Sequence, residues 1–127
     1  MNHEEATVRA FIQPTKRERY LAFLSNKKGR AKFILELTHF KSLNPKYIVP
    51  LLPSHQNPPS MGKILAAKDA GPKCWVISED PQLDGQEMEL DAALRDTIGP
   101  GIGAIISCIP GKLAYFEDED FRCILQR

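Results

Sequence analysis

A proline-rich segment, residues 44–60, divides this 127-residue chain into two parts with different sequence patterns. The segment holds five of the ten prolines. Because proline lacks a backbone N–H, the segment predicts neither a long helix nor a central strand. Its apolar residues, among them Ile48, Val49 and Leu51, indicate contact with a core. We therefore expect a proline-rich strap that runs over the core, with residues 47–49 as a short edge strand.

Residues 1–43 carry the pattern of three helices. Their apolar side chains recur at intervals of three and four residues, which places them on one face of a helix. Asn2 and Thr15 are the expected N-caps of the first two helices, and Pro14 ends the first. The third helix is expected from about Arg30 to Leu43. Three apolar faces can be buried only if the helices pack together or against a sheet.

Residues 61–127 carry the pattern of an α/β part with a C-terminal hairpin. The expected elements, in order, are a helix capped by Ser60, a strand over 74–78, a helix over 88–98, and strands over 104–109, 113–116 and 121–125. The apolar run over 104–109 is typical of a strand covered on both faces. Because a helix separates it from the strand over 74–78, we expect these two strands to form a parallel pair.

The combined patterns predict one α+β domain over residues 1–127. The N-terminal helices are expected to pack on a small mixed β-sheet of three or four strands, and the proline-rich strap joins the two parts. Trp75 and Ile105 belong to apolar strands, so we expect both in one core between the sheet and the helices.

Composition excludes several classes of protein. Hydrophobic residues make up 43% and charged residues 26% of the chain, as in ordinary globular proteins. No apolar run approaches the ~18 residues of a membrane span, and the acidic start lacks the apolar core of a secretory signal. The three cysteines are not closely spaced. We expect a cytoplasmic protein with reduced, structural cysteines and no membrane association.

Charge is distributed unevenly along the chain, although the formal net charge is +1. Residues 1–63 hold eleven Lys/Arg and four Asp/Glu, whereas residues 64–127 hold six Lys/Arg and twelve Asp/Glu. The two halves can neutralise each other within the fold, pair between molecules in a homo-oligomer, or attract oppositely charged partners.

Basic residues gather at the expected starts of the second and third helices. Cations there oppose the helix dipole, so helix stability does not explain their position. The free N–H groups of a helix start, together with basic side chains, instead suit a phosphate or a carboxylate. The anion-binding candidates are Lys16, Arg17, Lys27, Lys28, Arg30 and Lys32. Two alternatives remain: a helix-turn-helix whose second helix begins in this run, and a solvated basic face that pairs with the acidic half.

An acidic cluster offers a second candidate site. Glu79, Asp80 and Asp84 follow the expected strand over 74–78, and Lys112 joins them at one sheet edge if the next strand is parallel. The acids over 117–120 would then lie at the opposite edge. Such carboxylates suit a divalent metal. Their spacing matches no defined metal motif, however, and short acidic side chains also cap turns.

Other candidate motifs give little support for a catalytic site or a phosphate-binding loop. No motif for nucleophilic catalysis surrounds the cysteines, serines or histidines. Gly99, Gly101 and Gly103 lead from a helix into a strand, whereas phosphate loops lead from a strand into a helix. These glycines therefore predict a flexible turn.

Together these features predict a non-enzymatic intracellular binding module that needs no cofactor. Its expected partner is a nucleic acid, an acidic protein or another phosphate-bearing molecule, bound at the basic helix starts. The alternative is a small metal-assisted hydrolase or nuclease that holds a divalent metal at the acidic cluster.

Overall fold

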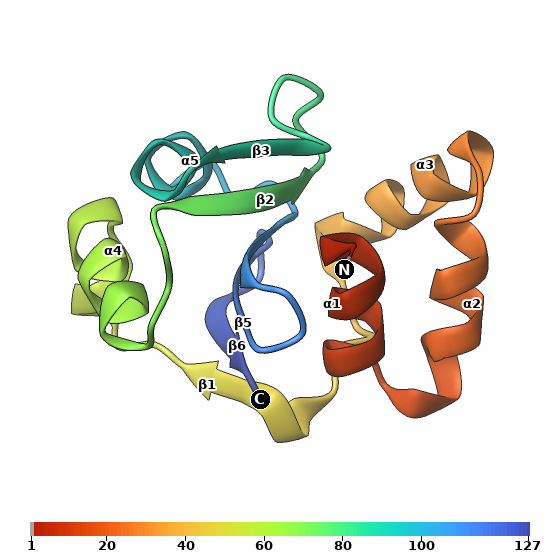
Figure 1. Cartoon of the computed structure of the whole chain (residues 1–127), viewed down its shortest axis with the longest axis horizontal. Coiled ribbons are helices and arrows are strands. Elements are labelled where there is room, and N and C mark those ends of the chain that lie inside the picture. Colours follow the sequence, from red (N-terminus) through yellow and green to blue (C-terminus); the bar gives the residue numbers. More distant parts are fainter. Residues whose placement is uncertain (1) are drawn as a thin grey trace.

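A six-stranded antiparallel sheet lies between two groups of helices in the computed structural model, which describes residues 2–127 (Figure 1). The five α-helices are α1 (His3–Phe11), α2 (Arg17–Phe23), α3 (Lys27–Glu36), α4 (Pro58–Ala67) and α5 (Leu90–Thr97). The strands are β1 (Ile48–Pro50), β2 (Lys73–Ser78), β3 (Gln86–Glu89), β4 (Ala104–Ile109), β5 (Leu113–Glu117) and β6 (Arg122–Gln126). The α+β class expected from the sequence is confirmed.

The sheet differs from the expected one in size and direction. Its order is β1-β6-β5-β4-β2-β3, so it has six strands rather than three or four, and every pairing is antiparallel rather than mixed. The parallel pairing of β2 with β4 was wrong, because Trp75 lies opposite Ser107 and Ser78 opposite Ala104. The reason is β3, a strand that the sequence pattern missed. It reverses the chain after β2, so α5 connects β3 to β4 across β2.

Alternate residues of the central strands face two separate hydrophobic cores. The first core lies under α1, α2 and α3, and it receives Ile77, Ile105, Ala114, Phe116, Cys123 and Leu125 from the sheet. The second lies under α4 and α5, and it receives Cys74, Val76, Ile106, Cys108, Tyr115 and Ile124. Ile105 is fully buried in the first core, as expected. Trp75 packs against the same core but is only partly buried.

The proline-rich strap contains more regular structure than expected. Its strand, β1, pairs with β6 at the sheet edge, one residue later than the sequence pattern placed it. Short 3-10 helices cover Pro45–Tyr47 and Pro53–His55. Asn57, rather than Ser60, caps α4, so Pro58 and Pro59 occupy the first turn. Prolines are tolerated there because the first N–H groups of a helix have no partner within it.

The helices α2 and α3 approach each other closely at Gly29. A Cβ atom on this residue would lie 2.5 Å from the carbonyl oxygen of Phe23, so any larger residue would push the two helices apart. The third helix ends earlier than expected. It gives way to a 3-10 turn over Leu37–His39, and Leu43 instead forms a β-bridge with Ile12. None of the described helices is long and apolar enough to cross a bilayer.

Candidate functional site

Three of the predicted anion-binding residues lie together on the outer face of α3. Lys27, Lys28 and Lys32 are exposed, and within residues 2–127 none of them forms an ion pair. Lys28 and Lys32 are one helical turn apart, so their side chains are neighbours. Ala31 and Leu35 complete this face, and the Leu35 side chain is 74% exposed. We call these five residues the outer face of α3.

The start of α3 leaves backbone donors without an acceptor. The Asn26 side chain accepts a hydrogen bond from the Gly29 N–H at 2.7 Å, and the Asn26 carbonyl accepts one from the Arg30 N–H at 3.0 Å. The N–H groups of Lys27 and Lys28 have no protein acceptor among the described residues. The first turn of α3 also contains no acidic residue. This helix start therefore offers N–H groups and ammonium groups to the same exterior region.

Arg30 has a different role from the lysines beside it. Its guanidinium donates to both carboxylate oxygens of Glu4, at 3.1 and 2.7 Å, and to both oxygens of Asp84. These contacts raise the pKa of Arg30 and hold α1, α3 and the β2–β3 loop together. Within residues 2–127 it is the one Lys or Arg of the basic half that forms a salt bridge with an acid of the other half. The Arg30 guanidinium therefore already has two carboxylate partners within the fold.

Lys16 and Arg17 lie at the opposite end of α3 from Lys27. Lys16 lines a small pocket of about 250 Å³ together with Arg19 and Lys41. Arg19 pairs with Glu36 at 3.0 Å, whereas the Nε atom of Arg17 is buried without a hydrogen-bond partner in the described part of the chain. The six candidates thus fall into three groups. These are the three lysines of α3, the paired Arg30, and Lys16 with its neighbour Arg17.

The acidic cluster predicted as a metal site is held by donors of the protein itself. Glu79 accepts hydrogen bonds from the Gly103 N–H and the Thr38 hydroxyl, both at 2.5 Å. Asp80 accepts one from the Gln82 N–H at 2.9 Å. The third acid, Asp84, is bound to Arg30, and it also accepts a hydrogen bond from the Ser78 backbone N–H. These carboxylates thus stabilise turns, and the metal site stays a prediction.

Lys112 does not join the acidic cluster. It follows β4, and because β2 and β4 are antiparallel, the β4–β5 hairpin lies at the start of β2 rather than at its end. The run Glu117–Asp120 instead lies at the same sheet edge as Glu79, since Ala104 pairs with both Ser78 and Glu117. Both expected positions were wrong for the same reason, the missed reversal at β3.

Glu117 is a buried carboxylate that the sequence pattern did not single out. Its exposed fraction is 0%, and one oxygen accepts hydrogen bonds from the N–H groups of Gly99 and Gly101 at 3.3 and 3.1 Å. The other oxygen accepts from the Tyr115 hydroxyl and pairs with the Arg122 Nε, both at 2.9 Å. Burial, with Glu117 beside it, raises the pKa of Tyr115. Gly99 and Gly101 have φ values of 123° and 76°, which favour glycine. The glycine turn therefore binds an anion of the chain itself.

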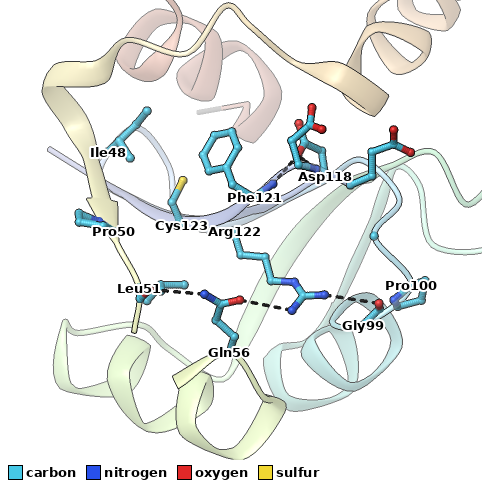
Figure 2. A pocket seen from close by; sticks show the side chains of 13 residues that line it. Ile48, Pro50, Leu51, Gln56, Gly99, Pro100, Asp118, Phe121, Arg122 and Cys123 are labelled. Carbon is cyan, nitrogen blue, oxygen red and sulfur yellow. Dashed lines mark hydrogen bonds between the residues drawn. The ribbon is translucent and has the colours of Figure 1, made fainter. Parts of the chain in front are cut away.

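A pocket of about 710 Å³ lies next to Glu117, between β1, β6 and the glycine turn (Figure 2). The Arg122 guanidinium crosses it and lies 3.4 Å from both the Gln56 side-chain oxygen and the Gly99 carbonyl oxygen (Figure 2). Since Arg122 is paired with Glu117, its charge is already balanced. We call this space the Arg122 pocket.

Two exposed acids at the rim of the Arg122 pocket contact His39. Its Nδ1 lies 3.1 Å from an Asp120 oxygen, and its Nε2 lies 3.0 Å from a Glu119 oxygen. The hydrogen bond with Asp120 and the charge of Glu119 raise the pKa of His39. These three side chains could present ligand atoms to a metal ion. The contact of both ring nitrogens with carboxylates, however, is the arrangement of a protonated imidazole in an ion pair.

We expect slow thiol labelling in the native protein. Cys74, Cys108 and Cys123 are free and buried. Burial raises the pKa of Cys74 to about 11 and the pKa of Cys108 and Cys123 to about 12, so little thiolate is present at neutral pH. A disulfide reagent at pH 7.5 should modify all three only at the rate of unfolding, and rapidly in denaturant. Rapid labelling of one cysteine in the native protein would contradict this expectation.

Comparison with protein-family models, curated proteins and solved structures finds no match to this chain. Its function is therefore inferred from its own residues.

Proposed function

We propose that this protein is a non-enzymatic binding module that accepts a nucleic acid on the outer face of α3. The observation that carries this proposal lies at the start of one helix. Three exposed lysines have no ion pair within residues 2–127, and two backbone N–H groups beside them have no acceptor there. A phosphate would satisfy both kinds of donor. Because cations at a helix start cost stability, their position is better explained by a ligand than by the helix itself.

The composition of the outer face of α3 favours contacts to phosphates over contacts to bases. Lysine acts on phosphate as a point charge, and such contacts fix position without reading sequence. The face carries no arginine, asparagine or glutamine with which to make bidentate contacts to bases. The helices α2 and α3 are joined by residues 24–26, as a helix-turn-helix would require, and this alternative stays a prediction. We therefore expect binding with little sequence preference and a strong dependence on salt.

The test is the double variant Lys27→Ala with Lys28→Ala, titrated with a short DNA duplex and with a single strand at low salt. We expect weaker binding of the duplex and a salt slope that is smaller by about 1–2 units, since each lost phosphate contact removes ~0.9 of a released counterion. The melting temperature should stay the same or rise slightly, because the unfavourable charges at the helix start are gone. Fluorescence anisotropy at three or more salt concentrations gives the slope.

The matched control is the double variant Lys63→Ala with Lys112→Ala. Both lysines are exposed, neither forms an ion pair among residues 2–127, and neither lies on α3. The control removes the same charge, so it should change the salt slope much less. If the control variant weakens binding as much as the α3 variant does, binding depends on the net charge and not on the outer face of α3. If neither the duplex nor the single strand binds the unmodified protein at low salt, the proposed function is wrong.

A further inference from the structure

A second pocket, of about 550 Å³, lies beside Trp75 at the free edge of the sheet, away from the outer face of α3. Residues from α1, α3, β2 and β3 line it, among them His3, Glu4, Arg30 and Glu87. Trp75 belongs to β2 and Glu87 to the edge strand β3. We call this space the Trp75 pocket.

The Trp75 ring is fixed in place and only partly covered. Its indole N–H donates a hydrogen bond to a Glu4 oxygen at 2.9 Å. The His3 ring stacks on it, with ring centres 6.2 Å apart and planes at 10°, and is itself hydrogen-bonded to the Ser107 hydroxyl at 2.7 Å. Burial lowers the pKa of His3, which favours the neutral imidazole. Trp75 therefore offers a partly exposed aromatic surface in an orientation set by its neighbours.

Among residues 2–127, the charged side chains around the Trp75 pocket are mostly acidic. The single guanidinium, Arg30, is bound by the carboxylates of Glu4 and Asp84. Glu87 lies directly opposite Trp75 in the strand register, so both side chains project from the same face of the sheet. Glu87 is exposed, and within residues 2–127 its side chain has no hydrogen-bond or ion-pair partner. Among the side chains of residues 2–127, three carboxylates thus surround one cation, and one of the three has no partner in that part of the chain.

We infer that the Trp75 pocket binds an organic cation, a guanidinium or alkylammonium group, between the Trp75 ring and the Glu87 carboxylate. The negative face of an indole attracts such a group, and tryptophan does so best among aromatic residues. The carboxylate opposite the ring supplies the balancing charge. An anion would be repelled by Glu87. The Arg30 guanidinium already donates to Glu4 and Asp84, so an anion finds no free donor among these charged groups.

Trp75 is the only tryptophan of the chain, so its emission reports directly on this pocket. The protein is titrated with tetramethylammonium chloride, with N-acetylarginine amide, and with a short Gly/Ser peptide that contains one arginine. Sodium chloride at equal ionic strength and the same peptide with glutamine in place of arginine are the controls. We expect a saturable change of emission, together with a shift of the Trp75 indole N–H resonance, for the cations alone.

Two variants identify the carboxylate. Glu87→Gln should weaken binding roughly two- to fivefold, the range of an exposed ion pair. Glu89→Gln removes the same charge from the same strand, but Glu89 pairs with Lys73 and does not line the pocket, so affinity should stay nearly constant. Both positions are exposed, and circular dichroism checks that each variant folds.

The outcomes separate the possible sources of the cation. Binding of the small cations and the peptide supports recognition of the group itself, and binding of the arginine peptide alone supports a side chain presented by a protein. A linear response equal to that of sodium chloride overturns the inference. So does an equal loss of affinity in the Glu87 and Glu89 variants. Neither result bears on the nucleic-acid proposal, which concerns other residues and a ligand of opposite charge.

Discussion

Replacing Glu117 by alanine should lower the free energy of unfolding by about 3–5 kcal/mol, the usual cost of removing one partner of a buried ion pair. The change leaves the Arg122 guanidinium without its partner, and it removes the acceptor of the Gly99 and Gly101 N–H groups and of the Tyr115 hydroxyl. Since a domain of this size is stable by only ~5–15 kcal/mol, the midpoint of urea unfolding should fall clearly.

The control for Glu117 is Glu119→Ala, two residues along the chain. The Glu119 side chain is exposed and pairs with the exposed His39, so the expected loss is below about 1 kcal/mol. Equal urea midpoints for the two variants would show that the buried carboxylate does not stabilise the glycine turn.

Replacing Phe33 by alanine should cost a similar amount, about 3–5 kcal/mol, through the loss of packing and the cavity left behind. The Phe33 ring is buried between Tyr20 and Phe40, with ring centres 5.3 and 6.1 Å away. These rings join α2 and α3 to the first core, so the loss should appear as a lower free energy of unfolding in urea.

Leu35, on the same helix, provides the matched comparison for Phe33. Because its side chain is 74% exposed, Leu35→Ala should change stability by no more than about 0.5 kcal/mol. If Leu35→Ala proves as costly as Phe33→Ala, then the outer face of α3 is not exposed in solution. That result would also remove the basis of the nucleic-acid proposal.

Sequence predicted best those elements whose burial fixes their pattern. The run over 104–109 is apolar on both faces because β4 is central and each face meets a different core, and the strand lies where it was expected. The edge strand β3 was missed because its sequence, Gln-Glu-Met-Glu, is almost entirely polar. An edge strand with exposed side chains needs no apolar pattern, and without β3 the direction of β4 could not be deduced.

Local charge patterns predicted only the parts of the site that depend on local structure. Lys27, Lys28 and Lys32 are exposed because they lie on the side of α3 opposite its buried residue, Phe33. The pairing of Arg30 with Asp84 joins residues far apart in sequence, so the helical periodicity of the sequence does not indicate it. In the sequence, Glu117 is one of four consecutive acids, and nothing in that run distinguishes it from the others. Its burial is possible only because donors from two other segments meet it in the folded chain.

The pairing of β1 with β6 has a consequence for the order in which the chain can fold. Residues 48–50 pair with residues 123–125, and β6 also supplies Cys123 and Leu125 to the core under α1, α2 and α3. At about 5–20 residues per second, a ribosome needs several seconds to make the intervening chain. During that time the helical half lacks the core residues that β6 supplies, and β1 lacks the strand with which it pairs. We expect its native packing to form only after β6 leaves the ribosome, so the emergence of β6, rather than helix formation, sets the moment at which this domain folds.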